Sequence, residues 1–109
     1  MEIRAYQTAT GRSPFQDWYD ALNDPASVRV TRTLEQLAKG NLSNAKSVGS
    51  GVHEYRIDFG PGYRIYFGRE GLEIVLLLTG GDKRRQQRDI NAAISYWTDH
   101  KRHARGNQA

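Results

Sequence analysis

The feature that most constrains the fold is a strict alternation of apolar and polar side chains over residues 52–67, interrupted once by Gly60-Pro61-Gly62. Successive side chains of a β-strand point to opposite faces, and Gly-Pro-Gly is typical of a tight turn. The segment therefore predicts an antiparallel hairpin with one apolar face. In the first strand, that face carries His53, Tyr55, Ile57 and Phe59, and the other carries Glu54, Arg56 and Asp58.

A three-residue loop at 60–62 predicts a specific register for this hairpin. Apolar residues then face apolar ones in the pairs Phe59–Tyr63, Ile57–Ile65 and Tyr55–Phe67. On the polar face, the same register pairs Asp58 with Arg64 and Arg56 with Tyr66. A slip of one residue would move every side chain to the wrong face, so the pattern favours this pairing.

Two helices are predicted before the hairpin. The first begins at Ser13-Pro14, with Ser as the N-cap, Pro at the first helical position and Gln16 completing a capping box. The second begins at Asp24-Pro25 by the same logic and ends at Lys39-Gly40. Because the connection is very short, the two helices should form an α-hairpin. A short strand over residues 3–6 precedes them.

The rest of the chain predicts a sheet and a last helix. Residues 72–79 are nearly all apolar, as in a central strand covered on both faces, and Gly80-Gly81 should end it. A helix is expected over residues 84–98, and a short edge strand near residues 46–48. The fold class is therefore α+β: an N-terminal strand and an α-hairpin packed on one face of a twisted antiparallel sheet, with a C-terminal helix.

Composition limits the class of protein. With 109 residues and no internal repeat, the chain predicts one domain over residues 1–100, followed by a basic, flexible tail over residues 101–109. There is no cysteine, which excludes a disulfide framework or a thiolate site. No signal peptide is apparent, and the longest apolar run, residues 74–78, cannot span a bilayer. A cytoplasmic protein without membrane association is expected.

The positive charge is concentrated toward the C-terminus. The formal net charge is +4, and residues 83–105 contain seven Lys and Arg against two Asp. Such clustering favours a polyanionic partner, either nucleic acid or an acidic protein. A solvated charged helix explains the charge equally well.

Two segments together carry a family resemblance. Residues 54–67 read Glu-Tyr-Arg-Ile-Asp-Phe-Gly-Pro-Gly-Tyr-Arg-Ile-Tyr-Phe, and residues 76–83 read Leu-Leu-Leu-Thr-Gly-Gly-Asp-Lys before the last helix. The chain resembles the RelE/ParE toxin superfamily, and most closely its HigB-like, phage Gp49-like addiction module killer branch. The strand and α-hairpin that come first agree with this layout, so the resemblance covers nearly the whole chain.

The resemblance implies a small toxin of a type II toxin–antitoxin system. Its partner would be a cognate antitoxin, often a helix-turn-helix protein, in a toxin–antitoxin hetero-oligomer. Many members are mRNA interferases, ribosome-dependent endoribonucleases (hydrolases) that bind RNA and need neither metal nor another cofactor. ParE members instead poison DNA gyrase. Fold alone does not choose between these activities, and a non-toxic basic nucleic-acid-binding module is a third interpretation.

Metal-free RNA cleavage uses the 2′-hydroxyl of the ribose as nucleophile and needs a base, cations around the phosphorane and an acid for the leaving oxygen. The resemblance places Arg64 as the stabiliser of the transition state and Arg56 as a phosphate contact. Lys83 is the candidate for proton transfer, because a crowded lysine can lose its proton near neutral pH and an arginine cannot. A salt bridge to Asp58 is the structural alternative for Arg64.

Candidate RNA contacts extend this set. Three arginines crowd the first turns of the last helix, where positive charge opposes the helix dipole, as if a polyanion were bound there. Antitoxin pairing or plain solvation would also explain them. The expected RNA-binding residues are Arg84, Arg85, Arg88, Lys46 and Tyr66. Lys101, Arg102 and Arg105 are weaker extensions of the same idea.

The chain departs from the RelE pattern in two places. Asp58 stands where RelE-type enzymes tend to have another basic residue, and the last helix begins without a tyrosine that some members use. Tyr66 could replace that tyrosine in space. His100 and His103 are weaker candidates because HigB members can use a histidine near the C-terminus. His53 is expected at the edge of the core, and no spacing of acidic residues predicts a metal site.

Overall fold

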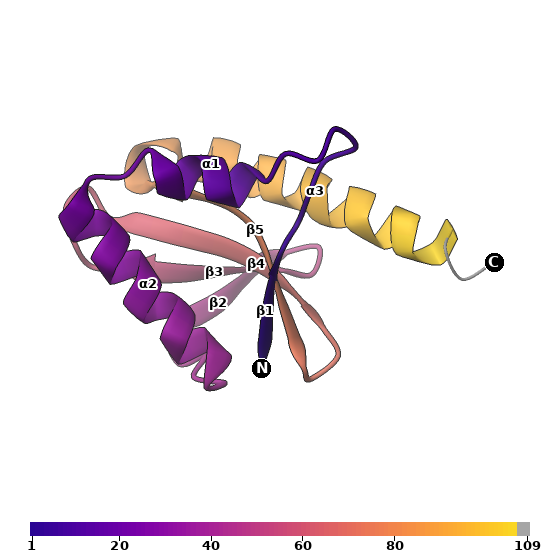
Figure 1. Cartoon of the computed structure of the whole chain (residues 1–109), viewed down its shortest axis with the longest axis horizontal. Helices are drawn as coiled ribbons and strands as arrows, with labels where there is room; N and C mark the ends of the chain where they lie inside the picture. The colour runs from indigo at the N-terminus through magenta and orange to yellow at the C-terminus, as the bar shows by residue number, and fades with distance from the viewer. Residues whose placement is uncertain (107–109) are drawn as a thin grey trace.

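A five-stranded mixed sheet forms the centre of the molecule, and three helices cover its faces (Figure 1). The computed structural model describes residues 1–106. The strands are β1 (Glu2–Ala5), β2 (Ala45–Gly49), β3 (Val52–Ile57), β4 (Tyr63–Glu70) and β5 (Ile74–Asp82). The helices are α1 (Pro14–Asp20), α2 (Asp24–Ala38) and α3 (Gln86–Gly106), with one 3₁₀ turn over Lys83–Arg85. The α+β class predicted from the sequence is confirmed.

The sheet has the strand order β1-β5-β4-β3-β2, and β1 runs parallel to β5. The prediction of a wholly antiparallel sheet is therefore wrong at this edge. The successive strands β2 to β5 pair antiparallel, and β5 has a second edge to fill. β1 fills it in the register Glu2↔Ile74 to Ala5↔Leu77. This pairing makes β5 an inner strand, as its apolar sequence predicts.

The hairpin of β3 and β4 forms, but its register differs by two residues from the predicted one. Ile57 faces Tyr63, Tyr55 faces Ile65 and Arg56 faces Arg64. The longer loop over residues 58–62 closes through a hydrogen bond from Gly62 N to Phe59 O (3.1 Å). Gly60 and Gly62 have φ of 57° and 80°, which favours glycine at both positions. A shift of two keeps each side chain on its face, so the alternating pattern could not distinguish the two registers.

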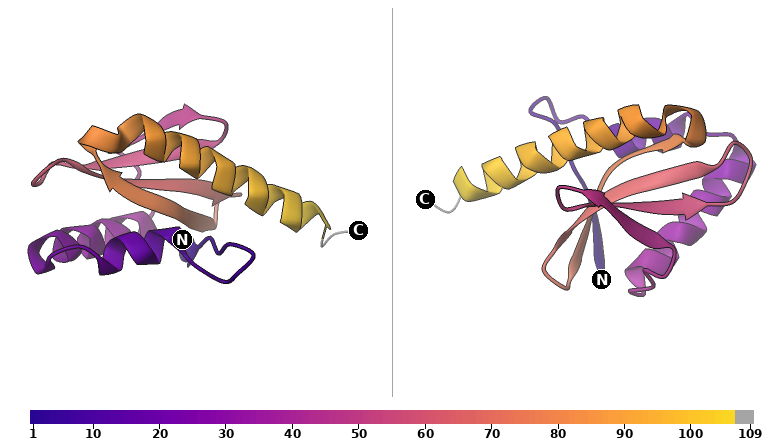
Figure 2. Two further views of the ribbon diagram at one scale, coloured as in Figure 1. Left: turned by 90° about the horizontal axis from the view of Figure 1, so that it is seen from above. Right: turned by 180° about the vertical axis from the view of Figure 1, so that it is seen from behind.

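Helices cover both faces of the sheet, not one as predicted (Figure 2). α1 and α2 pack on one face, and α3 packs on the other. The apolar residues of β5 alternate between the two cores: Val75 and Leu77 lie in the first, Leu76 and Leu78 in the second. A strand that is apolar on both sides needs cover on both sides, and α3 supplies the second layer.

The helix starts follow the capping signals. Ser13 Oγ accepts a hydrogen bond from Gln16 N (3.1 Å), which begins α1. Asn23 Oδ1 accepts one from Ala26 N (3.0 Å), so Asn23, one residue before the predicted start, is the N-cap of α2. Each helix has a proline in its first turn, as expected. The α-hairpin is therefore confirmed.

Two predicted boundaries differ in the structure. β5 continues through Gly80 and Gly81 to Asp82 instead of ending at the glycines. A Cβ at Gly80 would overlap the Trp18 ring, and one at Gly81 would overlap the Asp89 carboxylate, so these glycines allow close packing and do not break the strand. α3 extends to Gly106, so residues 101–106 of the expected tail are helical, and residues 107–109 lie outside the described residues.

Gly68 of β4 allows Trp97 of α3 to lie directly on the sheet. A Cβ at this position would fall inside the indole ring, and Trp97 itself is 6% exposed. We expect Gly68→Ala to lower the free energy of unfolding by about 1–3 kcal/mol, the usual cost of overpacking. Urea denaturation measures the change, and because the φ of Gly68 lies outside the left-handed region, the loss would come from overlap with Trp97 and not from backbone strain. Equal stability of wild type and Gly68→Ala would contradict the close packing.

Tyr6, in the loop after β1, contacts two residues of α3. Its hydroxyl donates to Asp99 Oδ2 (2.5 Å), and its ring stacks on Tyr96 at 5.2 Å. Burial, and then the hydrogen bond to Asp99, raise the pKa of Tyr6 to about 12 from its usual 10.0. The folded state thus holds this proton more tightly than the unfolded chain does.

Stability should therefore fall as pH rises from about 10 to about 12, because only the unfolded chain loses the Tyr6 proton in that window. We expect Tyr6→Phe to remove this part of the alkaline slope. Unfolding free energies of both proteins, measured at intervals between about pH 9 and about pH 12, test whether Tyr6 causes this slope. Parallel slopes in the two proteins would show that Tyr6 titrates normally.

Candidate functional site

A fully buried carboxylate, Glu54, lies at the centre of the polar residues on the α3 face of the sheet. Glu54 is in β3 and is 0% exposed. Its Oε1 accepts a hydrogen bond from the hydroxyl of Tyr66 (3.1 Å) in β4 and one from Gln86 Nε2 (2.8 Å) at the start of α3. A single carboxylate oxygen thus joins two strands and a helix.

Two cations flank Glu54. Arg64 Nε lies 3.2 Å from Oε1, and Lys46 Nζ lies 3.5 Å from Oε2. The Arg64 contact is an ion pair and not a hydrogen bond, since Nε has no hydrogen-bond partner within residues 1–106. Arg64 Nη1 donates to Gly62 O (2.7 Å). These contacts hold the Arg64 guanidinium in one position beside the hairpin loop.

The two cations differ in exposure. The Arg64 side chain is 6% exposed and that of Lys46 is 60% exposed. Only a small part of the Arg64 guanidinium is therefore within reach of a ligand, whereas Lys46 is free to contact one. The predicted pairing of Arg64 with Asp58 is wrong, because Arg64 contacts Glu54 in the observed register.

Tyr66 is 0% exposed, which corrects its predicted role as an RNA contact. A fully enclosed ring offers no face on which a base could stack. Burial raises the pKa of Tyr66 above its usual value, and the nearby Glu54 adds to the effect. The hydroxyl therefore remains a proton donor to Glu54 and helps to position that carboxylate.

Arg56 faces Arg64 directly across the hairpin, on the same side of the sheet. Its side chain is 57% exposed, and its Nη2 is 3.9 Å from Asp58 Oδ1. Asp58 is 94% exposed, so the pair is weak. Two arginines side by side repel each other, and an anion bound between them would relieve that repulsion.

Lys83 lies at the same end of the sheet. It is exposed and begins the 3₁₀ turn after β5, where Asp82 Oδ1 caps Arg84 N (3.0 Å). A Cβ at Gly62 would be 3.3 Å from Arg64 Nη1 and 3.5 Å from Lys83 Cβ, so Gly62 lies between these two side chains. The structure thus brings the three predicted catalytic residues, Arg56, Arg64 and Lys83, to the loop end of the hairpin.

The arginines at and just before the start of α3 line a pocket separate from the residues around Glu54. Arg84, Arg85 and Arg88 line a cavity of about 340 Å³. Its other walls include Trp18 and Tyr63, which meet edge to face at 6.2 Å. The structure therefore separates these predicted RNA contacts from the residues around Glu54.

Two acidic residues, Asp82 and Asp89, also line that pocket and balance part of its charge. Burial raises the pKa of the Asp89 carboxyl, while Arg88 acts in the opposite direction.

The histidines have structural contacts. His53 stacks on Phe67 at 5.4 Å, at the edge of the core as expected, and burial lowers its pKa. His100 stacks on Trp97 at 5.7 Å and contacts Glu70. His103 lies 3.3 Å from Asp99, four residues earlier in α3. Neither C-terminal histidine contacts a predicted catalytic residue within the described chain.

Within residues 1–106, no group of three or more His, Asp or Glu side chains is placed to hold a metal ion. In the same part of the chain, no helix combines the length and the apolar character needed to cross a bilayer.

Sequence reasoning missed Glu54 and Gln86. The signal for Glu54 was its place in the polar row of β3, but the predicted register put Arg56 opposite Tyr66 and left Glu54 without a partner. The observed register places Lys46, Glu54 and Tyr66 in one row across three strands. Gln86 gave no local signal, because only the packing of α3 on the sheet brings it to Glu54.

The fold and the site define a small α+β domain with a cation-rich surface around one buried carboxylate. No family model matches the chain. It is 40% identical over 94 residues to an uncharacterized protein from Haemophilus influenzae, an alignment that covers 85% of this chain and 91% of the relative. The chain belongs to the same family as that protein.

Proposed function

We propose that the protein is the toxin of a type II toxin–antitoxin system and acts as a metal-independent, ribosome-dependent mRNA endonuclease of the RelE/ParE superfamily, HigB-like branch. The observation that carries the proposal is the gathering of Arg56, Arg64 and Lys83 at one end of the sheet. The resemblance assigned catalytic roles to these residues, although Arg56 lies in β3, Arg64 in β4 and Lys83 in the turn after β5. The helix pair, the antiparallel strands and the C-terminal helix agree with that superfamily.

The three side chains suit different parts of the reaction. The ribose 2′-oxygen attacks the phosphorus, the bond to the 5′-oxygen breaks, and a 2′,3′-cyclic phosphate and a 5′-hydroxyl result. The 2′-hydroxyl proton passes to a base, and the leaving oxygen receives a proton from an acid. Exposed Arg56 would hold the phosphate, and Arg64 would stabilise the pentacoordinate charge from its fixed position. Lys83 is exposed and not crowded, so its ammonium group would donate the proton to the leaving 5′-oxygen.

The position of Glu54 supports this division of labour. Preorganised charge is most effective when it does not have to move during the reaction. Glu54 and Gly62 hold Arg64 from two sides. Glu54 would then be a positioning residue, because it is buried and cannot touch the substrate.

The proposal includes partners and a compartment. We expect a cognate antitoxin, of helix-turn-helix type, in a hetero-oligomer with this chain, and the ribosome with its mRNA as the target in the cytoplasm. Exposed arginines at the start of α3 would contact ribosomal RNA or the antitoxin.

The deep burial of Arg64 favours a second candidate. If Arg64 serves only as the partner of Glu54, the surface is a binding site without chemistry, as in a ParE-like inhibitor of DNA gyrase. The basic surface alone is also compatible with a non-toxic nucleic-acid-binding module.

Controlled expression in a bacterial host without the antitoxin distinguishes the three functions. The endonuclease predicts growth arrest, a rapid fall in amino-acid incorporation and broken messages, while thymidine incorporation continues at first. A gyrase inhibitor predicts intact messages and early loss of thymidine incorporation with DNA damage signalling. Normal growth at high expression would favour the non-toxic module.

A further inference from the structure

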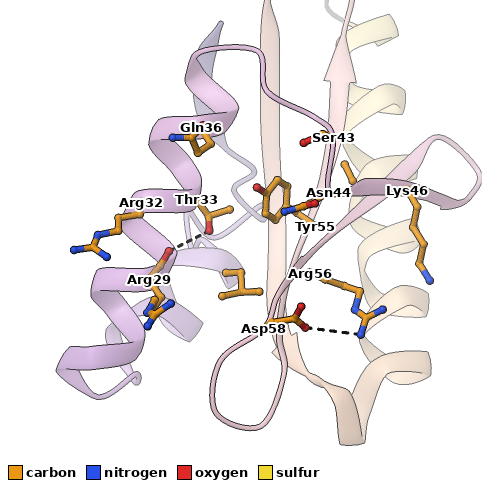
Figure 3. A pocket seen from close by; sticks show the side chains of 12 residues that line it. Arg29, Arg32, Thr33, Gln36, Ser43, Asn44, Lys46, Tyr55, Arg56 and Asp58 are labelled. Carbon is orange, nitrogen blue, oxygen red and sulfur yellow. Dashed lines mark hydrogen bonds and ion pairs between the residues drawn. The ribbon is translucent and has the colours of Figure 1, made fainter.

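A basic groove of about 650 Å³ lies between α2 and the ends of β2 and β3, beside the candidate site (Figure 3). Arg29 and Arg32 come from α2, and Lys46 and Arg56 come from the strand edge, where their side chains project away from α2 (Figure 3). Among the residues that line it in the described chain, Asp58 alone is acidic.

On the α2 wall, a contact with an aromatic ring restricts the position of one arginine. The Arg29 guanidinium lies over the Phe59 ring at 4.6 Å, and this cation–π contact restricts its position. Thr33 Oγ1 donates to Arg29 O (3.1 Å) and lines the same wall. Figure 3 shows Arg32 one turn farther along the helix, with its guanidinium directed outward from the strands.

The strand wall offers open polar groups. The pairing of β2 with β3 begins at Ala45↔Tyr55, so within the described chain the backbone of Arg56 and Ile57 has no β2 partner. Tyr55 and Ile57 are 6% and 8% exposed, and they offer little apolar surface to a ligand. A ligand would thus meet mainly charges, amides and backbone groups.

The groove and the candidate site share two residues. Lys46 lines the groove and also contacts Glu54 (3.5 Å). Arg56 lines the groove and faces Arg64 across the hairpin. A polymer that passes from the groove around the β2–β3 edge of the sheet would therefore meet Lys46 and Arg56 on its way to the catalytic candidates.

We propose that this groove binds the phosphodiester backbone of the single-stranded RNA that flanks the cleaved phosphate. The inference rests on the proposed function and adds a substrate-holding surface to it. Arginine forks bind phosphate oxygens in pairs, and a polymer with regularly spaced negative charges matches cations that follow one another from α2 to the strand edge. An acidic protein segment fits less well, because protein partners bind mainly through buried apolar anchors and this groove has few.

The test compares two double variants that each lose two positive charges. Arg29→Gln with Arg32→Gln removes the α2 wall, and Arg12→Gln with Lys39→Gln removes two exposed charges outside the groove. Fluorescence anisotropy measures the binding of each to a labelled single-stranded RNA oligonucleotide over a range of salt concentrations. An oligoglutamate peptide serves as a second, non-nucleic anion.

For the groove variant we expect about tenfold weaker RNA binding at physiological salt. The slope of log K against log salt concentration should become shallower by about 1.4, because each lost phosphate contact on single-stranded RNA contributes about 0.7. The control variant should change both quantities by less than half as much. Equal losses in the two variants would overturn the groove, since only net charge would then matter. Loss of oligoglutamate binding with RNA binding retained would also overturn it, in favour of an acidic protein partner.

Cleavage by the wild-type protein on programmed ribosomes separates the two proposals. If the wild type cleaves and the groove variant binds RNA normally, the groove inference fails and the proposed function stands. If the wild type binds RNA through the groove but cuts nothing, the endonuclease fails and the groove stands as an RNA site. A wild type that neither binds nor cleaves contradicts both.

Discussion

Replacing Glu54 with alanine is expected to lower the free energy of unfolding by about 3–5 kcal/mol, the usual cost of removing one partner of a buried ion pair. The change leaves Arg64, 5% exposed, without its counter-ion. It also removes the oxygen that accepts hydrogen bonds from Tyr66 and Gln86, and the fully buried Tyr66 hydroxyl then loses its partner. Urea denaturation followed by circular dichroism measures the loss.

Two variants define the cause of that loss. Glu54→Gln keeps an oxygen acceptor and loses the charge, so its cost should lie between those of the wild type and Glu54→Ala. Lys46→Ala removes the exposed partner of Glu54, and we expect a change below about 1 kcal/mol because solvent screens that pair. If Glu54→Ala costs no more than Lys46→Ala, Glu54 is not the centre of the network.

Replacing Lys83 with methionine should lower the rate of mRNA cleavage on ribosomes by about 100-fold or more, the usual contribution of a general acid or base. The side chain is exposed, so stability should remain within about 0.5 kcal/mol of the wild type. Single-turnover cleavage of a ribosome-bound message measures the rate. This variant tests the chemistry more cleanly than Arg64→Ala, which would also leave Glu54 buried without its closest cation.

Lys83→Arg and Arg84→Gln are the matched controls. Arginine keeps the positive charge but does not lose its proton near neutral pH, so Lys83→Arg should remain slow if Lys83 transfers a proton. Recovery of the rate in Lys83→Arg would assign Lys83 an electrostatic role only. Arg84→Gln removes a neighbouring charge that the proposal assigns to binding, so its single-turnover rate at saturating protein should stay close to that of the wild type. An equal loss of that rate would show that the total charge of the turn matters and not Lys83 in particular.

Local signals predicted the helices well. Ser13-Pro14 and Asp24-Pro25 predicted the starts of α1 and α2 to within one residue. These capping signals depend only on neighbouring residues, because the cap side chain accepts a hydrogen bond from a backbone N–H in the first turn. The alternation in β3 and β4 likewise assigned each side chain to the correct face. These parts of the fold are determined within about ten residues of sequence, as capping and strand periodicity are.

Long-range contacts decided the rest. The loop of the hairpin could close after three or five residues without changing any face, so the register depended on Gly60, Gly62 and the packing of β3 against its neighbours. Gly80 was interpreted as a strand end because the ring that covers it, Trp18, lies more than sixty residues away in sequence. The cover of α3 on the second face follows from β5 being apolar on both sides, which the sequence did show.

The candidate site was predictable in its three cations and not in the residues that position them. Arg56, Arg64 and Lys83 were found from the family resemblance, and the structure brings them together. Glu54 and Gln86 were missed because an acidic residue in a strand and a glutamine in a helix are ordinary until the tertiary structure joins them. The reverse holds for Tyr66, whose aromatic ring suggested a base contact and whose burial excludes one.

The most direct measurement of the central claim is primer-extension mapping of one mRNA incubated with the purified protein, with and without ribosomes, alongside Lys83→Met and Arg64→Ala. If the protein is a ribosome-dependent endonuclease, we expect cuts in the reading frame that appear only with ribosomes and wild-type protein, and that are absent or greatly reduced in both variants. An uncut message with unimpaired translation would contradict the endonuclease and leave an inhibitory or nucleic-acid-binding protein.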